Sequence, residues 1–560
     1  MNVGGWEFLL PASPRRRWLH VDASHGATTL LLAPMCDELC VVPGSAEAEY
    51  RIVDVVGAEG VGNVKIARES ALFARGEGAK SAFDGFILHD LEGVLSRRTV
   101  EQALRAAAWQ VGAGGFVYVA LRNRFGYTRL RRGWSEAMKG SGGAYFSWRS
   151  MRDLVARGRY VTLYPLICGE DGQVTDIVPP GGYKSDKNPT LWKEQLRRCL
   201  LGRQGAPRWS PGFAMVATGE PLVRSALQES LDTLTRHGCL EKPAALVRDL
   251  KRYHVVNGGK AILSIGSAQG TFGSHIVILV RSIEHVKRRR HEAKLLALLA
   301  QLPPDLSAKI PRFYYEEEVG GAHVFVLQEF PGITLDAPVP ALYPATLEAA
   351  RFLARLHLST RHVVHLNESS FRECLSACIE IVRKRYPVLS DVVGGLENTL
   401  RKNLIGKDCP MVWMHGDFKI ENVVVHERTG SLLGVIDWEL SERQGLPLLD
   451  LWYLLLYNRQ IERGEDFLTA VQSFLPPKEL TSIETEVCND YMRDLNIPAR
   501  LVPCLVAALV LHHAGRRMAY DSDDTAAMQV LQCLLAGIQA WIGSEEASSS
   551  TLVPEAALGA

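Results

Sequence analysis

The chain has 560 residues, of which 47% are hydrophobic and 22% charged, and its formal net charge is +1. This length exceeds the size of one ordinary hydrophobic core, so we expect at least two domains. The balanced charge argues against a dedicated nucleic-acid-binding protein, which usually carries a basic domain or stripe. We therefore predict no nucleic-acid partner.

Cysteine spacing and hydropathy favour a cytoplasmic protein. The closest cysteine pairs, Cys36/Cys40 and Cys374/Cys378, have the spacing of one helical face rather than that of a metal knuckle. Scattered single cysteines of this kind are typical of reduced thiols in the cytoplasm. The most hydrophobic run, residues 501–511, is far shorter than the roughly 20 residues that cross a bilayer, so we predict no membrane span.

Short apolar runs alternate with helix-like stretches over the first 220 residues. Strand-like examples are ELCVV at 38–42, FDGFILHDL at 83–91 and GGFVYVALRN at 114–123. Such alternation indicates a parallel sheet that is covered by helices on both faces. We predict an α/β doubly wound domain over residues 1–220.

The end of the first predicted strand carries a resemblance to a cofactor-binding family. In the segment WLHVDASHGATTLLLA, Asp22 ends the strand and Gly26 precedes a helix, and a later Ala-Gly-Gly segment follows at 113–115. This order resembles class I methyltransferases, and the resemblance implies an S-adenosylmethionine site at Asp22 and Gly26. Ser24 and Thr28 stand where that family has glycine, and their side chains would hinder the approach of the backbone to a ligand. We therefore expect a methyltransferase-like fold whose cofactor binding is impaired or lost.

A second domain is predicted over residues 245–545. Residues 221–244 are helix-like without a strand and are predicted to connect the two domains. Strand-like runs then flank a basic and apolar helix that begins near residue 282, and the sequence after residue 345 is mostly helical apart from 411–438. The final stretch, 546–560, is polar and small, and we predict a disordered tail there.

Two short segments hold the residues with the clearest chemical signal. HGDFKIEN (415–422) contains Asp417 and Asn422, and GVIDWE (434–439) contains Asp437 at the end of an apolar strand. Phosphoryl transfer from ATP needs a carboxylate that orients the attacking hydroxyl and accepts its proton, and oxygen ligands that hold Mg²⁺. Each residue alone could be a turn former or a strand cap. That alternative does not predict all three together.

With GLPLLDL (445–451), these segments resemble the aminoglycoside phosphotransferase and choline kinase branch of the protein-kinase-like fold. The resemblance implies an α+β bilobal domain that uses ATP and Mg²⁺ to phosphorylate a hydroxyl of a small molecule, sugar or glycan. It implies that Asp417 is the catalytic base and that Asn422 and Asp437 bind the metal. It also implies that His415 stabilises the loop and that Asp450 braces it.

The same resemblance implies nucleotide contacts ahead of the catalytic loop. A Gly-rich turn, a helix glutamate and the segment between the two lobes are expected to surround ATP, because backbone N–H groups near glycine can approach an anion. The family's strand lysine has no obvious counterpart; Arg281 is our first choice for this cation, and Lys287 is the second. The predicted ATP-binding residues are Gly266, Gly270, Gly273, Arg281, Glu292, Gln328, Glu329 and Phe330.

Three functional hypotheses remain open. The first is a Mg²⁺- and ATP-dependent phosphotransferase. The second is a bifunctional enzyme that also methylates with S-adenosylmethionine. The third is a non-catalytic pseudoenzyme scaffold, which the replaced glycines and the doubtful strand cation favour and which the presence of Asp417, Asn422 and Asp437 opposes.

Overall fold

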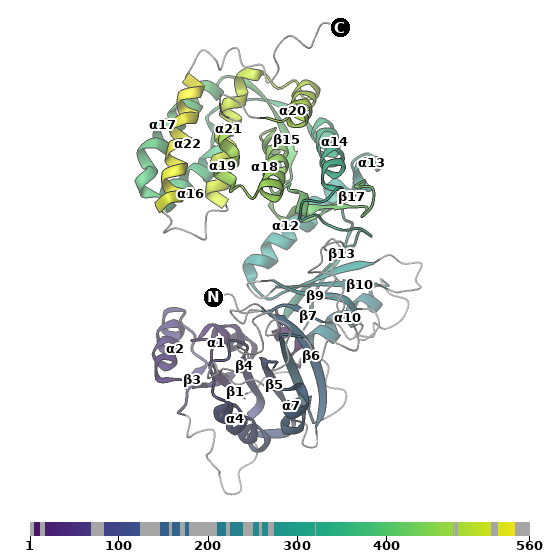
Figure 1. Ribbon diagram of the computed structural model, residues 1–560, viewed down its shortest axis with the longest axis vertical. Coiled ribbons are helices and arrows are strands. Elements are labelled where there is room, and N and C mark those ends of the chain that lie inside the picture. The colour runs from purple at the N-terminus through teal and green to yellow at the C-terminus, as the bar shows by residue number, and fades with distance from the viewer. Residues whose placement is uncertain are drawn as a thin grey trace. The chain divides into compact units, whose positions relative to one another are not determined.

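The computed structural model describes residues 5–11, 17–68, 83–123, 146–155, 159–168, 174–178, 210–219, 225–238, 250–256, 260–266, 274–319, 321–473, 475, 480–516 and 525–543 (Figure 1). The chain forms two compact units. Unit 1 comprises Met1–Ser185, Pro189–Arg289 and Phe313–Glu329, and unit 2 comprises Asp186–Asn188, Arg290–Arg312 and Phe330–Ala560. The predicted tail at 546–560 lies outside the described residues.

The first part of unit 1 is a mostly parallel sheet. Strands β1 to β5 run parallel in the spatial order β3-β2-β1-β4-β5; β8 then pairs antiparallel with β5, and β6 pairs antiparallel with β8. The strands are β1 (Arg17–Asp22), β2 (Glu38–Pro43), β3 (Val64–Ile66), β4 (Phe83–Asp90), β5 (Val111–Arg122), β6 (Tyr160–Cys168) and β8 (Gly212–Thr218). Strand β8 is buried along its whole length and β4 from its third residue onward, as their continuous apolar runs predict.

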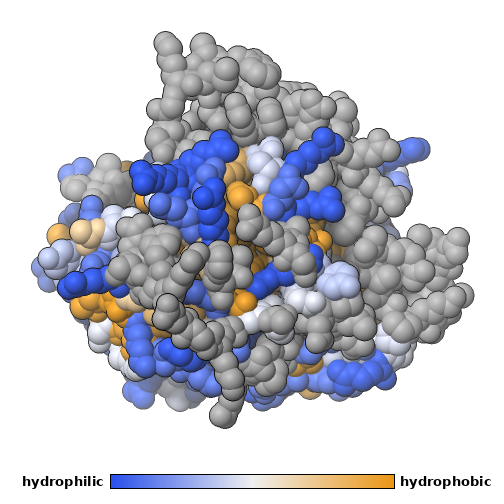
Figure 2. All heavy atoms as spheres, turned by 90° about the horizontal axis from the view of Figure 1, so that it is seen from below, coloured by the Kyte–Doolittle hydropathy of each residue, from blue (hydrophilic) through white to orange (hydrophobic). Residues whose placement is uncertain are grey.

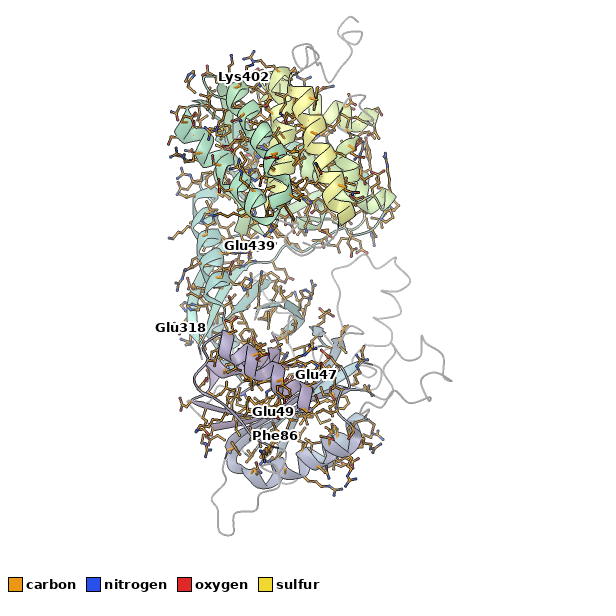
Figure 3. All side chains as sticks on the ribbon, turned by 90° about the vertical axis from the view of Figure 1, so that its left-hand side faces the viewer. Glu47, Glu49, Phe86, Glu318, Lys402 and Glu439 are labelled. Atoms are coloured by element: carbon orange, nitrogen blue, oxygen red, sulfur yellow. The ribbon has the colours of Figure 1, made fainter. Side chains whose placement is uncertain are left out.

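Helices cover both faces of this sheet. One hydrophobic core contains residues of η1 (Glu7–Leu9), α1 (Ala27–Leu32), α2 (Ala46–Ala58) and α10 (Ala226–Arg236). The other contains residues of α4 (Arg97–Gln110) and α7 (Trp148–Val155), together with the fully buried Phe86 of β4 (Figure 3). The predicted α/β doubly wound fold is therefore confirmed. Hydrophilic side chains make up much of the coloured surface in Figure 2, with smaller hydrophobic areas between them.

An antiparallel sheet continues the first one. Its five strands have the order β9-β10-β11-β13-β12, and β7 joins it to the parallel part, so that unit 1 holds one 13-stranded sheet. The strands are β7 (Val174–Ile177), β9 (Leu250–Val256), β10 (Lys260–Ile265), β11 (His275–Val280), β12 (Phe313–Val319) and β13 (Ala322–Gln328).

The predicted connection at 221–244 does not separate the two units. Within it, α10 buries Leu227, Leu231 and Leu234 in the core of unit 1. The N-terminal segment 5–11 is also buried there, and the Tyr253 hydroxyl of β9 donates a hydrogen bond to the Gly5 carbonyl at 2.6 Å. Long-range strand pairing thus attaches the antiparallel strands to the first part of the chain.

Unit 2 is mostly helical. Helix α12 (Ile283–Leu299) begins in unit 1 and ends in unit 2. Later helices are α13 (Pro304–Ser307), α14 (Leu342–Thr360), α15 (Glu368–Phe371), α16 (Ala377–Arg385), α17 (Ser390–Leu404), α18 (Leu449–Arg463), α19 (Phe467–Gln472), α20 (Ser482–Asp494), α21 (Val502–Arg516) and α22 (Thr525–Gly543). Helices α17, α21 and α22 lie side by side (Figure 1).

Two small sheets complete unit 2. The strands are β14 (His362–His365), β15 (Asp408–Met414), β16 (Val423–Val425), β17 (Leu432–Val435) and β18 (Glu442–Gly445), with the orders β14-β15-β18 and β16-β17. Antiparallel strands followed by helices are the predicted α+β arrangement, which is confirmed. In the described part of the chain no single helix has the length and apolarity to cross a bilayer, although the bent pair Ser482–Asp494 and Ala499–Gly515 reaches that length jointly.

Candidate active site

The predicted catalytic residues lie in a buried loop between β15 and β16. Strand β15 is buried from its second residue to its end, and its apolar side chains hold the start of the loop in place. Asp417 and Asn422 are 7% and 8% exposed. The Asn422 amide nitrogen donates to the Asp417 backbone oxygen at 2.9 Å and lies 3.2 Å from its Oδ2. The structure thus brings these two predicted residues into direct contact.

Asp437 lies beside the same loop. The backbone N–H of Ile436 donates to the Asn422 carbonyl at 2.9 Å, which ties the end of β17 to the loop. Asp437 has φ 66° and ψ 60°, a left-handed conformation that aspartate adopts more readily than most residues. Backbone strain of this kind is often concentrated at functional sites.

The oxygen atoms of Asn422 and Asp437 are of the type that Mg²⁺ prefers. The nitrogen of Asn422 is used in its bonds to Asp417, so its Oδ1 is the atom that could bind a cation. In the part of the chain that the structure describes, no group of three His, Cys, Asp or Glu residues could hold a metal by itself. Mg²⁺ usually binds through one or two carboxylates and the phosphates of its substrate. Asn422 and Asp437 therefore match the smaller ligand set that a Mg²⁺-nucleotide needs.

Asp450, at the start of α18, holds the loop backbone. Its Oδ2 accepts a hydrogen bond from the His415 N–H at 2.6 Å, and its Oδ1 accepts one from the Gly416 N–H at 2.9 Å. Burial alone would raise the pKa of Asp450, but the hydrogen bond and charge of His357 and the bonds from the loop lower it below its usual value. The carboxylate thus accepts hydrogen bonds from two consecutive backbone groups of the loop.

His415 supports the loop as a neutral imidazole. Burial lowers its pKa, although the charges of Asp450 and Asp437 oppose this shift. Its Nε2 donates to the Ile436 carbonyl at 3.0 Å, and its Nδ1 accepts from the Asp417 N–H at 3.3 Å. The ring therefore connects both halves of the candidate site.

His357 of α14 contacts the same loop region, although no motif in the sequence indicates it. This side chain is fully buried, with Nε2 3.6 Å from Asp450 Oδ2 and Nδ1 hydrogen-bonded to the Tyr491 hydroxyl. The same hydroxyl accepts from the N–H of Leu448, which has φ 70°. The only sequence signal is a single histidine in an apolar helix, which does not by itself distinguish a positioning residue from a core residue.

Glu292 of α12 is close to the candidate metal ligand. It is 3% exposed, and its Oε1 accepts a hydrogen bond from the Trp438 N–H at 3.0 Å. Trp438 directly follows Asp437. Glu292 therefore holds the backbone beside a predicted metal ligand. This contact differs from the one that the family resemblance implies, in which the helix glutamate pairs with a cation.

Of the predicted Gly-rich turn, the structure describes Gly266. Gly266 follows β10 at the end of the sheet where β13 ends, since His275 of β11 pairs with both Ile265 and Gln328. Gly270 and Gly273 lie outside the described residues. Gly266 and the end of β13 thus lie at the same end of the sheet.

The predicted adenine-binding segment is only partly available for such contacts. The Glu329 N–H donates to the Ser274 carbonyl at 3.0 Å, and its Oε1 accepts from Ser264 Oγ at 2.5 Å. Phe330 packs on β17 so closely that a Cβ added to Gly434 would lie 2.3 Å from its ring. Glu329 therefore cannot offer its N–H to a base without losing a strand-end hydrogen bond.

Arg281 does not have the surroundings of a phosphate-binding cation. Its Nη1 donates to the Gly321 carbonyl at 3.2 Å, and its guanidinium lies 5.3 Å from the centre of the Phe8 ring. Arg281 comes directly after Val280, the last residue of β11, and lies on the same face of the sheet as Leu279. The N-terminal segment covers this face. The second choice, Lys287, is exposed on α12.

The residues at the predicted S-adenosylmethionine site do not fit that cofactor. Asp22 is fully buried; its Oδ1 accepts from the N–H of Ser24 at 2.6 Å and from its Oγ at 2.8 Å. Its Oδ2 accepts from the Gly26 N–H at 3.1 Å and from Thr29 Oγ1. The carboxylate therefore closes its own loop instead of facing a ligand.

The neighbouring loops are also packed together. A Cβ added to Gly44, after β2, would lie 2.8 Å from Leu95 Cδ2. Leu95, from the loop after β4, is 2% exposed. An apolar side chain thus fills the space beside the described ends of β1 and β2.

We expect S-adenosylmethionine to leave the midpoint of thermal unfolding unchanged. A ligand at 100 times its dissociation constant would add about 2.7 kcal/mol, which is a shift of several degrees. The measurement is thermal unfolding of the full chain with up to millimolar S-adenosylmethionine or S-adenosylhomocysteine. A saturable upward shift would contradict the closed-loop interpretation.

A family model matches part of the chain. Residues 268–479 match the model of the Phosphotransferase enzyme family (APH). Acyl-CoA dehydrogenase family member 11 of Mus musculus is 29% identical over 160 residues, which are 27% of this chain and 20% of that protein. The chain thus spans about a fifth of the length of the curated relatives it matches.

Two solved structures are similar to different parts of the chain. Aminoglycoside phosphotransferase APH(3'')-Id from Streptomyces rimosus has 15% identity and a TM-score of 0.31, covering 51% of this chain and 92% of its own. A SAM-dependent methyltransferase from Thermotoga maritima has 13% identity and a TM-score of 0.25, covering 38% and 88%. The predicted resemblance of the C-terminal part is confirmed by the family match: residues 268–479, which match the phosphotransferase enzyme family model, contain the Asp417 loop, Asp437 and Asp450.

Proposed function

We propose that the chain is a Mg²⁺- and ATP-dependent phosphotransferase that phosphorylates a hydroxyl group of a small molecule or glycan. The observation that carries this proposal is the contact of Asn422 with Asp417, together with the backbone hydrogen bond from Ile436, the residue before Asp437, to Asn422. These bonds hold two carboxylate residues and an amide residue on neighbouring backbone segments, which is the residue set that Mg²⁺-dependent phosphoryl transfer needs. The phosphotransferase family match over this region supports the same chemistry.

Asp417 is the proposed base. Its Oδ2 lies 3.2 Å from the Asn422 amide nitrogen and 3.9 Å from Lys419 Nζ, and both groups favour the ionised carboxylate. In this state Asp417 can accept a hydrogen bond from the acceptor hydroxyl and take its proton as the phosphoryl group is transferred. The bond formed is between the acceptor oxygen and the γ-phosphorus, and the bond broken joins that phosphorus to ADP.

Asn422 and Asp437 are the proposed metal ligands. When bound, Mg²⁺ neutralises part of the negative charge on the phosphates. Asn422 and Asp437 fix the position of this charge, because the first is held by Asp417 and the second follows a residue bonded to the loop. Asp450 and His415 keep the loop backbone in register.

Lys419 lies beside the proposed base. Its Nζ is 3.0 Å from Glu421 Oε2, 3.9 Å from Asp417 Oδ2 and 5.5 Å from the centre of the Tyr457 ring. The two carboxylates compensate the charge of this lysine, and the aromatic ring beside it suits a hydroxylated acceptor that carries an apolar part. The described cysteines are free thiols, which supports a cytoplasmic location.

We expect Mg²⁺-ATP to raise the unfolding midpoint of the wild-type chain and to have no such effect on Asp437→Ala. At 100 times the dissociation constant the gain is about 2.7 kcal/mol, and each kcal/mol shifts the midpoint by roughly 2–4 °C for a unit of 150–250 residues. ATP with EDTA, and the exposed variant Glu427→Gln, serve as controls. The absence of a Mg²⁺-dependent shift in the wild type would contradict the proposal and favour the scaffold hypothesis.

A further inference from the structure

The N-terminal segment, residues 5–11, is buried in a hydrophobic core of unit 1. Its large apolar side chains are at most 1% exposed and belong to the same core as residues of β10, β11 and α10; they are Trp6, Phe8, Leu9 and Leu10. The Trp6 ring stacks on His89 of β4 and on Tyr118 of β5, with ring centres 4.5 Å and 4.7 Å apart. The segment therefore covers one face of the sheet with apolar and aromatic contacts.

Glu7 interrupts this apolar segment with an acidic side chain. It is fully buried, and neither of its carboxyl oxygens has a hydrogen-bond partner among the residues that the structure describes. An ionised carboxylate is costly to bury without such partners, whereas the protonated form is neutral and much easier to bury. Burial accordingly raises the pKa of Glu7 from 4.5 to about 7, although two backbone hydrogen bonds and the charge of Arg281 lower it in part. The buried position of the segment thus favours the protonated side chain.

The titratable groups around Glu7 keep their charge state near neutral pH. Burial raises the pKa of Tyr118 and of Tyr253 well above the usual value, so both hydroxyls stay neutral. Burial lowers the pKa of His89 to about 3, so this imidazole also stays neutral. Arg281, which follows β11, remains a cation because a guanidinium does not lose its proton in this range. In this set Glu7 is therefore the group whose charge changes near neutral pH.

Helix α10 also contacts the segment at η1. The large apolar residues that it contributes to this core are Leu227, Leu231 and Leu234. Its charged residues lie toward the surface: Glu229 and Asp232 are half-buried, and Arg236 is exposed and pairs with Glu317 of β12. The helix thus surrounds the segment with apolar side chains, which increases the cost of a charge on Glu7.

We propose that residues 5–11 form a proton-dependent latch, which is docked on the sheet when Glu7 is protonated and is released when Glu7 ionises. Release uncovers the ring pair of His89 and Tyr118 and also Arg281, whose guanidinium lies 5.3 Å from the centre of the Phe8 ring. The pKa of Glu7 is raised in the docked state, so docking is strongest at low pH and weakens as the pH rises to about 7. The latch lies within unit 1 and does not depend on the proposed phosphotransferase function.

The test is hydrogen exchange of the full chain, followed by mass spectrometry of peptides that cover residues 5–11. The N–H groups of Leu9 and Leu10 donate to the Trp6 and Glu7 carbonyls at 3.0 Å, so their protection reports the docked segment. After correction for the intrinsic pH dependence of exchange, we expect protection in the wild type to fall about tenfold per pH unit between about pH 5 and 7. The two pKa values of 4.5 and about 7 limit the total loss to about 300-fold.

Two variants isolate the contribution of Glu7. Glu7→Gln has nearly the same shape and is neutral at every pH, so its protection should not change with pH. Glu49→Gln changes an exposed carboxylate of α2 and should keep the pH dependence of the wild type. If Glu7→Gln does not fold, Glu7→Met provides a second neutral side chain of similar length, for which protection should again be independent of pH.

Three results would overturn the proposal. The first is protection that does not depend on pH in the wild type. The second is a wild-type pH dependence in Glu7→Gln or Glu7→Met, which would assign the proton to another group. The third is lower protection in Glu7→Gln than in the wild type at about pH 8, which would show that Glu7 docks as an anion beside Arg281.

Discussion

Replacing Asp417 with asparagine is expected to lower the rate of phosphoryl transfer by about 10²–10⁴-fold, because the isosteric amide cannot accept the proton of the attacking hydroxyl. The affinity for Mg²⁺-ATP should stay within a few-fold of the wild-type value, since Asn422 and Asp437 are unchanged. The measurement is ADP release in the presence of hydroxylated acceptors, together with nucleotide affinity by calorimetry.

The control for Asp417→Asn is Glu427→Gln, which changes one exposed carboxylate in the turn between β16 and β17. It should turn over at the wild-type rate. Equal rates for Asp417→Asn and the wild type would remove Asp417 from the chemistry. A loss of nucleotide affinity as large as the loss of rate would instead assign Asp417 to metal binding.

Replacing Asp450 with alanine is expected to lower the free energy of unfolding by about 2–5 kcal/mol. The change leaves the buried N–H groups of His415 and Gly416 without their acceptor, and each such group costs roughly 1–3 kcal/mol. Urea unfolding of the purified variant measures this loss. Phosphoryl transfer should fall as well, because Asp417 directly follows Gly416 in the braced loop.

Asp408→Ala is the matched control for Asp450. Asp408 pairs with His365 on the surface, where its side chain is 71% exposed, so the change should cost no more than about 0.5 kcal/mol. Similar losses for the two variants would contradict the bracing role.

The pKa of Asp450 is lowered in the folded state, so its stabilising contribution is complete at neutral pH and is lost only as the pH falls through the folded value.

The candidate catalytic residues could be predicted from the sequence because they are local. Asp417 and Asn422 lie within one loop, and the spacing between them allows the observed side-chain contact. Asp437 follows β17, which pairs antiparallel with β16. This single hairpin therefore brings Asp437 near the loop that precedes β16. Because these residues are close in sequence, a short segment was enough to predict the candidate site.

The surroundings of Arg281 could not be predicted in the same way. Arg281 was chosen because it follows the apolar run HIVILV. The face of the sheet on which such a residue lies depends, however, on which face the rest of the protein covers. The N-terminal segment covers the face of Arg281, and nothing in the local pattern indicates that residues 5–11 pack there. The contacts of His357 could not be predicted for the same reason, since its partners Asp450 and Tyr491 are distant in sequence.

Local hydrophobic patterns and short motifs were sufficient to predict the α/β and α+β character of the two parts and to indicate Asp417, Asn422 and Asp450 as candidate site residues. The pairing of β7 with β9, by which one sheet joins both parts within unit 1, depends on the tertiary structure. The same is true of the Asp22 loop, which is closed on its own carboxylate, and of Arg281, whose face of the sheet is covered by the N-terminal segment. Strand register, burial of one face and packing between distant segments are properties of the whole chain, and a local sequence window does not contain them.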